Sequence, residues 1–413
     1  MAATVIILAG GLGSRLGNVD LPKTLVLVNQ RPVLDHILTQ VDRLDVRECL
    51  ITTYHLADQV ESWIDKNRFR FSFPIKTIRE ERLAGTRSSL LTALKYVDTE
   101  DIILLLGDVI FTLSLSSYIA QWRKSSSEYA FVTYANSYFN TCDLVLERDG
   151  NIRIYKKNEL KIYEPHISAL SGIMFAKHTS LRKSLETSSE IDFEAHILTL
   201  ENLHKVLFIP SLDFFYDVGT PDRLARARKA KARDFSTSLR KPRMILIDRD
   251  DTLVSDPGNN IKAEPEFLEY FIDFLGKCNR NEIPVIVLTN QSRIGRGIIS
   301  QQEHFSFFDR IYRSLASYGT FISDYFFCEH NPEIRKCECR KPNSGLLDQV
   351  RQRYQDFDKY TCVYLGDSHS DMEFANRANI EFIHISLIKS CELPTPHICF
   401  TTSNIEQLYE YLN

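Results

Sequence analysis

The chain has 413 residues, of which 44% are hydrophobic and 25% are charged, and its formal net charge is -4. The length favours two or three domains, and we expect two. The composition is typical of a globular enzyme, and the slight negative charge gives no reason to expect nucleic acid as a partner. No apolar run is long enough to span a bilayer and no signal-peptide pattern is present, so we expect a cytoplasmic protein with no membrane partner.

The first expected strand, residues 4–8, leads into a glycine-rich loop that is followed by two cationic side chains. Glycines after a parallel strand let the backbone approach a phosphate closely, and the cations supply charge for a triphosphate and its pyrophosphate leaving group. An ordinary tight turn would explain the glycines but not the paired cations. The residues concerned are Gly10, Gly11, Gly13, Arg15 and Lys23. With these residues, the N-terminal part resembles the sugar-phosphate nucleotidyltransferases.

Helical and strand-like segments alternate after this loop. Apolar residues have helical spacing over 34–44, and residues 48–53 have the pattern of a strand. Such alternation predicts a doubly wound parallel sheet. Residues 80–89 then open a helix where the nucleotidyltransferases carry a base-recognition turn. Gly85 and Thr86 match that turn, but the next two residues differ from the small ones of the family, which leaves the nucleobase open.

Two aspartates follow apolar strands in the N-terminal half. Asp108 ends one such strand, and Asp217 ends another just before a turn. A carboxylate at the carboxyl end of a buried parallel strand lies at the ligand crevice of the sheet. Two carboxylates suit magnesium, which also binds triphosphate oxygens. For either aspartate alone, a helix cap or a turn is the alternative explanation.

The resemblance to the nucleotidyltransferases also covers the region between these aspartates. It implies that Lys157 meets the phosphate of the sugar substrate and that Gly172 belongs to the strand under the sugar. A solvated pair formed by Lys156 and Lys157 is the alternative. Residues 192–194 either contact the sugar or begin an exposed helix.

A basic helix over residues 222–233 precedes a polar stretch that we interpret as a linker, residues 236–242. The cationic run is short and isolated, so a solvated helix face explains it better than a nucleic-acid site does. We therefore expect a nucleotidyltransferase domain over 1–235 and a second domain over 243–413.

The second domain opens with an apolar strand that ends in D-x-D-x-T, which places Asp248 and Asp250 beside each other. One carboxylate can attack phosphorus while the other moves protons. Three further motifs follow, and their order resembles that of the haloacid dehalogenase superfamily of phosphohydrolases. Asp251 departs from the family, where glycine is common. The three motifs contribute Thr289 and Asn290, then Arg340 and Lys341, and then Asp367.

This resemblance implies a role for each motif residue. Asp248 is the expected nucleophile and Asp250 the expected general acid and base. Thr289 and Lys341 are expected to hold the phosphoryl oxygens, with Asn290 and Arg340 also on the phosphate side. The expected magnesium ligands are Asp248, Asp367 and the carbonyl of Asp250.

Three cysteines and a histidine in the pattern C-x-H, six residues, C-x-C match the ligand set of a tetrahedral zinc site. They are Cys328, His330, Cys337 and Cys339. The alternative is four unrelated polar residues in a loop. The spacing between the phosphatase motifs leaves no room for a large cap. With the zinc loop, the domain resembles the capless branch that contains the heptose-1,7-bisphosphate 7-phosphatases and the histidinol-phosphate phosphatases.

We therefore expect an α/β protein of two doubly wound domains: an N-terminal Rossmann-like nucleotidyltransferase domain and a C-terminal capless haloacid dehalogenase-like domain with a zinc loop. The two resemblances imply a bifunctional enzyme of nucleotide-sugar synthesis that uses Mg2+ at both sites, structural Zn2+, a nucleoside triphosphate and sugar phosphates. They favour removal of the 7-phosphate from D-glycero-D-manno-heptose 1,7-bisphosphate and transfer of GMP from GTP to the 1-phosphate. The alternatives are another sugar or polyol phosphate with CTP or UTP, or one active domain beside a degenerate regulatory or assembly module. The oligomeric state is left open.

Overall fold

The computed structural model describes residues 2–17, 20–135, 142–148, 151–199, 202–229, 243–355, 357–359, 361–386, 398–401 and 407–408. The chain divides into two compact units, which we treat separately: Met1–Tyr134 with Leu170–Phe235, and Ala135–Ala169 with Ser236–Asn413. The predicted linker, residues 236–242, lies outside the described residues. Among the described residues, no helix has both the length and the apolar character required to cross a bilayer.

The first unit is built on a mixed sheet whose central strands are parallel. Strands β6, β1, β4 and β5 lie side by side in that order, all parallel. Their apolar runs are buried, as expected for strands covered on both faces. β11 pairs antiparallel with β6, and β8 pairs with both β11 and β12. The strands are β1 (Ala3–Leu8), β4 (Val46–Thr53), β5 (Ile75–Arg79), β6 (Asp101–Leu106), β8 (Tyr129–Tyr134), β11 (Ile167–Lys177) and β12 (Val206–Ser211).

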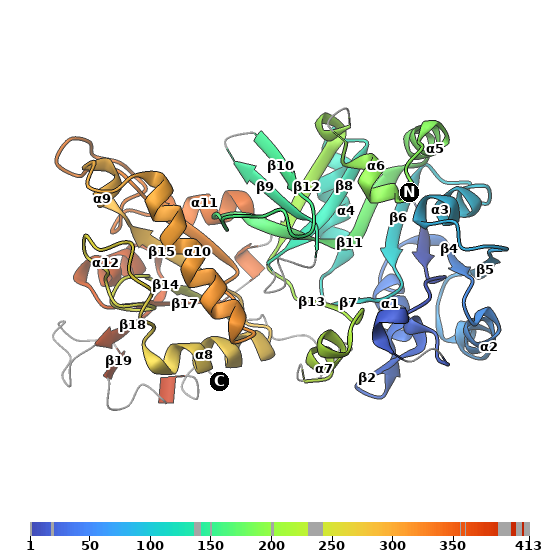
Figure 1. Ribbon diagram of the computed structural model, residues 1–413, viewed down its shortest axis with the longest axis horizontal. Helices are drawn as coiled ribbons and strands as arrows, with labels where there is room; N and C mark the ends of the chain where they lie inside the picture. Colours follow the sequence, from blue (N-terminus) through green and yellow to red (C-terminus); the bar gives the residue numbers. More distant parts are fainter. Residues whose placement is uncertain are drawn as a thin grey trace. The chain divides into compact units, whose positions relative to one another are not determined.

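Helices and short strand pairs complete this unit (Figure 1). The helices are α1 (Val33–Val41), α2 (Ala57–Asn67), α3 (Thr86–Leu94), α4 (Leu115–Lys124), α5 (His178–Thr187), α6 (Phe193–Ile197) and α7 (Pro221–Lys229), with 3-10 turns at Ser14–Leu16, Lys23–Leu25, Arg68–Arg70 and Leu203–Lys205. The short strands are β2 (Leu27–Val28) paired with β3 (Arg31–Pro32), and β7 (Val109–Phe111) paired with β13 (Phe215–Asp217).

The second unit contains a six-stranded sheet in which every pair is parallel, in the order β16-β15-β14-β17-β18-β19. This confirms the predicted doubly wound architecture. The strands are β14 (Arg243–Ile247), β15 (Val285–Asn290), β16 (Asp324–Cys328), β17 (Thr361–Gly366), β18 (Glu381–Ser386) and β19 (Ile398–Thr401). The helices are α8 (Glu269–Arg280), α9 (Ser292–Gly295), α10 (Gln301–Ser317), α11 (Gly345–Arg353) and α12 (His369–Ala378), with a 3-10 turn at Phe357–Lys359.

Helix α10 covers part of one face of this sheet (Figure 1). It begins with a capping box in which Ser300 and Glu303 satisfy each other's backbone N–H groups. Phe308 on its buried side lies 4.4 Å from Tyr325 of β16, measured between ring centroids. Between β15 and the Lys341 loop the chain forms only α9, α10, the sheet strand β16 and loops, so the structure agrees with the predicted capless form.

The segment 135–169 groups with residues 236–413 in this division by contacts, and the domain boundaries expected from the sequence stay a prediction. Its strands β9 (Leu144–Arg148) and β10 (Asn151–Tyr155) pair antiparallel, and β9 also pairs with residues 167–169, the start of β11, which belong to the same unit. The Tyr163 ring stacks on that of Tyr312, with centroids 3.5 Å apart. The physical reason for the grouping is therefore an aromatic and ionic contact surface that sequence proximity does not reveal.

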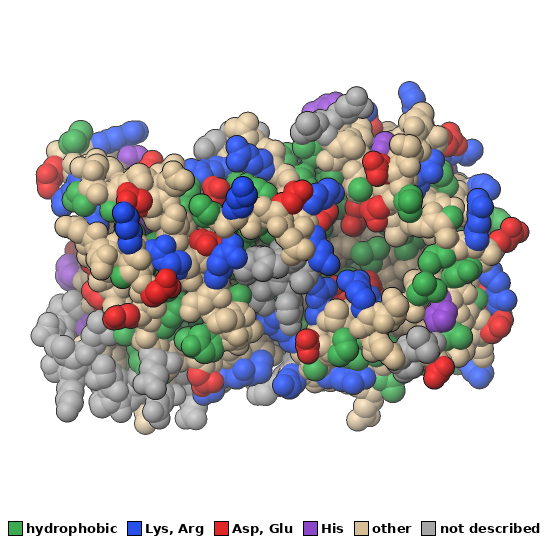
Figure 2. Space-filling model, viewed as in Figure 1, with side chains coloured by type: hydrophobic (Ala, Val, Ile, Leu, Met, Phe, Trp, Pro, Cys, Tyr) green, Lys and Arg blue, Asp and Glu red, His purple; other side chains and the backbone are tan. Residues whose placement is uncertain are grey.

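Buried ionic contacts reinforce this packing. The His166 ring lies 3.1 Å from the Asp324 carboxylate, and Arg353 Nε donates to the same carboxylate at 3.0 Å. Arg353 also donates to the main-chain oxygen of His166 at 3.0 Å. On the face drawn in Figure 2, cationic and anionic side chains are interspersed, which fits the nearly balanced composition.

Candidate active sites

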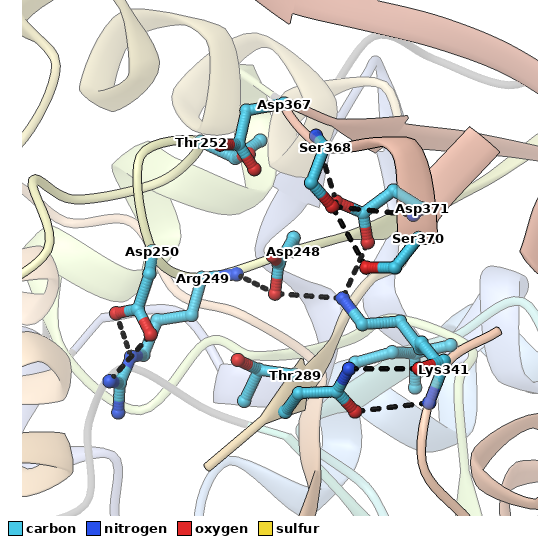
Figure 3. Close-up of polar contacts among 12 residues, drawn as sticks. Asp248, Arg249, Asp250, Thr252, Thr289, Lys341, Asp367, Ser368, Ser370 and Asp371 are labelled. Atoms are coloured by element: carbon cyan, nitrogen blue, oxygen red, sulfur yellow. Dashed lines mark hydrogen bonds and ion pairs between the residues drawn. The ribbon is translucent and has the colours of Figure 1, made fainter. Parts of the chain in front are cut away.

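Three carboxylates meet at the carboxyl edge of the second sheet. Asp248 follows β14 and Asp367 follows β17, which is its neighbour, while Asp371 lies in the first turn of α12. Oxygens of the three side chains lie within 4.8 Å of one another, a spacing that suits a cation (Figure 3). The strand order thus brings together Asp248 and Asp367, which lie far apart in the sequence.

The crowding of these carboxylates perturbs their protonation. Burial, with the negative charges of Asp371 and Asp250, raises the pKa of Asp248 to about 7, although Lys341 opposes the shift. Burial, followed by Asp248, Asp371 and Asp251, raises the pKa of Asp367 to about 7. Such raised pKa values mean that the cluster lacks enough positive charge to keep every carboxylate ionised. Hard oxygen ligands with unbalanced negative charge fit a divalent cation.

Lys341 supplies the positive charge that the cluster does have. Its Nζ lies 2.9 Å from Asp248 and 2.6 Å from Asp371, and its side chain is 1% exposed. Burial alone would lower the pKa of Lys341, but the two carboxylates outweigh it and raise the pKa. Tyr364 also accepts a hydrogen bond from Nζ, at 2.8 Å. Lys341 is therefore held as a cation beside the expected nucleophile.

Asn290 and Arg340 flank this lysine. The Asn290 amide accepts from the Lys341 N–H at 3.0 Å and donates to the Lys341 carbonyl at 3.1 Å, so it fixes the backbone of Lys341. One guanidinium nitrogen of Arg340, Nη1, is buried without a hydrogen-bond partner among the described residues. Phosphate contacts for both residues stay predictions, and for Arg340 the unsatisfied donor is a reason to expect one.

Arg249 and Gln291, which the sequence analysis missed, surround Asp250. Arg249 is completely buried and directs Nε and Nη2 at the two Asp250 oxygens, 2.7 and 3.0 Å away. Gln291 donates to Asp250 at 2.8 Å and to Thr289 at 3.0 Å. The sequence did offer one indication for Arg249, because an arginine stands directly between the two motif aspartates Asp248 and Asp250. For Gln291 there was no such signal beyond its position after Thr289.

The four predicted metal ligands of the C-terminal loop lie together. Neighbouring sulfur and nitrogen atoms of the cluster are 3.1 to 3.6 Å apart. Around a tetrahedral ion with Zn–S bonds near 2.3 Å, sulfur ligands would be about 3.8 Å apart. A disulfide would require a separation of about 2.05 Å, and the three thiols are free. The cluster, which consists of Cys328, His330, Cys337 and Cys339, therefore fits one tetrahedral metal ion.

The predicted nucleotide site of the first unit brings Asp108 and Asp217 together. Asp108 directly precedes β7, and Asp217 pairs with Val109 across the β7–β13 ladder. Asp108 forms an ion pair with Lys23, and Asp217 forms one with Arg223, a residue that the sequence analysis missed. Each carboxylate thus already holds a cationic side chain, and metal binding by this pair stays a prediction.

The glycine-rich loop lies beside this pair. Gly13 has a φ of 65°, in the left-handed region that favours glycine. A side chain on Gly219 would come within 3.1 Å of Lys23 Nζ and 2.6 Å of an Asp217 oxygen, so Gly219 leaves room for both. Arg15 is exposed in the same loop, whose remaining predicted members are Gly10 and Gly11.

Gly85 and Thr86 begin α3 and contact the segment before α6. A side chain on Gly85 would collide with Ile191, and the Thr86 hydroxyl donates to Asp192 at 3.1 Å. Asp192 caps α6 by accepting from the Ala195 N–H at 3.0 Å, which supports the helix-start interpretation of residues 192–194. The contact of Gly85 and Thr86 with a nucleobase stays a prediction.

Lys157 and Gly172, the two residues predicted to contact the sugar phosphate, lie in different parts of the structure. Lys157 is exposed in the second unit, where its N–H donates to Asp143 at 3.0 Å, and Lys156 forms an ion pair with the same carboxylate. Gly172 has a φ of 78°, and a side chain there would lie 2.8 Å from Leu106 of β6. Close strand packing accounts for this glycine. Their predicted sugar contacts are not tested by this geometry.

Comparison with protein families identifies the two parts of the chain. The MobA-like NTP transferase domain matches residues 5–200, and the polynucleotide kinase 3 phosphatase family matches residues 243–385. The chain is therefore an enzyme that combines a nucleotidyltransferase domain with a phosphatase domain of the haloacid dehalogenase type.

Relatives narrow the class of the phosphatase. The probable D-glycero-D-manno-heptose-1,7-bisphosphate 7-phosphatase of Thermoplasma volcanium is 33% identical over 140 residues, which are 33% of this chain and 94% of that protein. The D-glycero-beta-D-manno-heptose-1,7-bisphosphate 7-phosphatase of Yersinia pestis is 32% identical over 143 residues, 33% of this chain and 76% of that protein. The chain belongs to this family of phosphatases. The structure of HddC from Yersinia pseudotuberculosis is 22% identical with a TM-score of 0.45, covering 55% of this chain and 98% of that one, a likeness too low to carry an argument.

Proposed function

We propose that the chain carries out two steps of nucleotide-sugar synthesis. The phosphatase domain removes the 7-phosphate from D-glycero-D-manno-heptose 1,7-bisphosphate, and the nucleotidyltransferase domain transfers GMP from GTP to the 1-phosphate with release of pyrophosphate. The observation that carries the proposal is the presence, in one chain, of a nucleotidyltransferase domain and a phosphatase whose relatives are named for heptose bisphosphate. Because the donor is a nucleoside triphosphate, we place the enzyme in the cytoplasm.

In the phosphatase, an Asp248 oxygen attacks phosphorus and the bond from phosphorus to the sugar oxygen breaks. Asp250 gives its proton to the departing oxygen. Water then attacks the aspartyl-phosphate, Asp250 accepts the proton of that water, and inorganic phosphate leaves with Asp248 restored. The cationic Lys341 and the Thr289 hydroxyl stabilise charge on the phosphoryl oxygens.

The carboxylate cluster supports Mg2+ as the cofactor of this site. Asp248, Asp367 and the Asp250 carbonyl would hold the ion, and Asp371 lies close enough to take part. When bound, Mg2+ neutralises negative charge on the phosphate and on the carboxylates, which keeps Asp248 ionised and nucleophilic. The close approach of the three carboxylates and the raised pKa values of Asp248 and Asp367 support this proposal.

The cysteine and histidine cluster supports structural Zn2+. Four protein ligands would close the coordination sphere, which leaves no open position for substrate. Cys339 is followed directly by Arg340 and Lys341. We infer that the ion fixes the loop that carries these two residues beside Asp248, and that it takes no part in the chemistry.

In the nucleotidyltransferase, an oxygen of the sugar 1-phosphate attacks the α-phosphorus of the donor in line, and pyrophosphate leaves. No covalent enzyme intermediate is needed. Asp108 and Asp217 would hold Mg2+, and Arg15 and Lys23 would stabilise the pyrophosphate. The backbone of the glycine-rich loop (Gly10, Gly11 and Gly13) would bind the phosphates, Gly85 and Thr86 the base, and Lys157 and Gly172 the sugar phosphate.

The test supplies each of the four nucleoside triphosphates together with heptose bisphosphate or another sugar bisphosphate, and measures phosphate and pyrophosphate separately. We expect phosphate release without a donor and pyrophosphate release with GTP. Pyrophosphate only with CTP or UTP would overturn the guanylyl assignment, and none with any donor would indicate a degenerate transferase domain. An Asp248→Asn chain supplied with the sugar 1-phosphate serves as the control, because it should lose phosphate release and keep transfer.

A further inference from the structure

The Asp250 carboxylate is held by a fork of hydrogen bonds from its neighbour Arg249. Arg249 Nε lies 2.7 Å from Oδ1 and Nη2 lies 3.0 Å from Oδ2, and Figure 3 shows the carboxylate turned toward the guanidinium group. Two parallel bonds of this kind fix the direction as well as the position of a carboxylate. The Asp250 carboxylate is therefore held in place in its ionised form, the form that accepts a proton from water, before any substrate binds.

Buried groups behind Arg249 keep the guanidinium in place. Its Nη1 donates to the Tyr325 hydroxyl at 3.2 Å and faces His304 Nδ1 at 3.4 Å. Burial, and then the charge of Arg249, holds the pKa of His304 well below its ordinary value, so the ring is neutral and can accept at Nδ1. The Phe307 ring lies under the guanidinium carbon, 5.3 Å from its centroid. These contacts hold the Arg249 guanidinium in one position, and Arg249 in turn holds the Asp250 carboxylate.

Gln291 connects this fork to the predicted phosphate contact. Its Nε2 donates to Asp250 Oδ2 at 2.8 Å and to the Thr289 hydroxyl at 3.0 Å, while its Oε1 accepts from Arg249 at 2.8 Å. The side chain is buried, with 2% exposure. The amide has one acceptable orientation, because the flipped form would set its NH2 group against a guanidinium and its oxygen against a carboxylate.

These bonds also set the direction of the Thr289 hydroxyl. Because Thr289 accepts from Gln291, its own proton is free to be donated toward a phosphoryl oxygen. The same Nε2 is shared with Asp250, so a shift of Thr289 toward a bound phosphate changes the bond that restrains the acid. The Gln291 amide therefore links the position of Thr289, the expected phosphate contact, to the position of Asp250.

We propose that Gln291 is a positioning residue of the phosphatase, which together with Arg249 restrains the Asp250 side chain beside the phosphate site, where Asp250 exchanges protons with the leaving oxygen and with water. The inference rests on the proposed roles of Asp250 and Thr289. It predicts that Gln291 matters most for esters whose leaving oxygen requires a proton, such as the primary alcohol of a sugar. An aryl phosphate such as p-nitrophenyl phosphate expels a stabilised phenolate and requires little help from an acid.

The test compares these two substrates in the full-length chain. Gln291→Met keeps the volume and removes both N–H donors. We expect kcat for the sugar bisphosphate to fall about 100-fold, since misplacing a catalytic group by about 1 Å costs that much, and kcat for p-nitrophenyl phosphate to change less than about threefold. Gln291→Leu, which also removes both donors and adds no charge, should show the same selectivity if the Met variant folds poorly.

Matched controls separate the possible failures. Gln302→Met, on the exposed start of α10, should leave both rates unchanged. Asp250→Asn should show the same leaving-group selectivity more strongly, because it removes the acid itself. If Asp250→Asn shows no selectivity, the proposed role of Asp250 fails. If it does and Gln291→Met lowers both rates equally, or lowers neither, Gln291 is not a positioning residue for the acid.

Discussion

Replacing Lys341 by methionine tests the electrostatic account of the phosphatase site. Methionine has a similar length and no charge, so the change leaves Asp248 and Asp371 without their shared cation. The three side chains are almost fully buried, with exposures of 1%, 13% and 0% for Lys341, Asp248 and Asp371. Breaking a buried ion pair by removing one partner costs about 3 to 5 kcal/mol. Because two pairs are lost, we expect the upper end of that range in metal-free buffer at pH 8.

The two tryptophans make the measurement specific to one unit. Both Trp63 and Trp122 belong to the first unit, so tryptophan fluorescence follows the unfolding of that unit, while calorimetry follows both. Lys341→Met should lower the midpoint of the calorimetric transition of the second unit and leave the fluorescence transition of the first unit unchanged. Lys262→Met, at an exposed position of the second unit, is the matched control and should change neither transition.

A second substitution tests whether the loss comes from the uncompensated charge. Asp371→Asn should be destabilising in the wild-type chain, where it removes a partner of Lys341. In the Lys341→Met chain the same change should cost less or restore stability, with a coupling of about 1 to 3 kcal/mol. Two free-energy changes that simply add, or a Lys341→Met chain as stable as the Lys262→Met control, would refute the reasoning.

Three further substitutions test other parts of the second unit. Cys337→Ser should abolish stoichiometric zinc in metal analysis and lower the unfolding midpoint of the second unit; wild-type chain free of zinc would contradict the site. Burial lowers the pKa of His304, so its contribution to stability is present above pH 6.5 and is lost as the pH falls, by up to about 1.4 kcal/mol per pH unit. His304→Gln should flatten that slope in urea unfolding, and an unchanged slope would show that His304 does not cause it. Arg353→Met should cost about 3 kcal/mol and increase hydrogen exchange over residues 163–167, because Asp324 loses a buried partner. Arg351→Met, at an exposed position on the same helix, should change neither.

Two members of the carboxylate cluster could be predicted from sequence because they follow apolar strands, whereas the third, Asp371, lies in the first turn of α12 and was not predicted. Asp248 and Asp367 each follow a run of buried residues, and parallel strands present their carboxyl ends at one edge of a sheet. Their strands are direct neighbours in the observed order. Pattern and topology together therefore determine this part of the site without knowledge of any side-chain contact.

Residues that act through other side chains could not be found in the same way. Gln291 follows Thr289 by two positions, yet its importance depends on meeting Arg249 and Asp250 from another strand. Arg223 likewise gains meaning only from its ion pair with Asp217. Such contacts depend on rotamers and packing across elements, and a one-dimensional pattern does not contain them.

The contacts of the segment 135–169 could not be predicted from the sequence for a related reason. The contacts of Tyr163 and His166 are with Tyr312 and Asp324, about 150 residues further along the chain, and nothing local to the segment identifies these partners. The stretch matches the nucleotidyltransferase family together with its flanks, as part of residues 5–200. The family match and the division by contacts therefore describe this segment in different ways.

Asp251 shows how a departure from a motif can be compatible with an intact site. Its φ of 53° lies in the left-handed region, where glycine is favoured and another residue costs about 1 kcal/mol or more. The Asp251 carboxylate offsets this cost by accepting from the Asp256 N–H at 2.9 Å, and Asp256 in turn pairs with Arg293 at 2.6 Å. The charge of Asp251 also helps to raise the pKa of Asp367. An aspartate in place of the common glycine therefore costs backbone strain but adds hydrogen bonds that stabilise the loop. It also adds negative charge near the three carboxylates, which favours cation binding, and it leaves every predicted site residue in place.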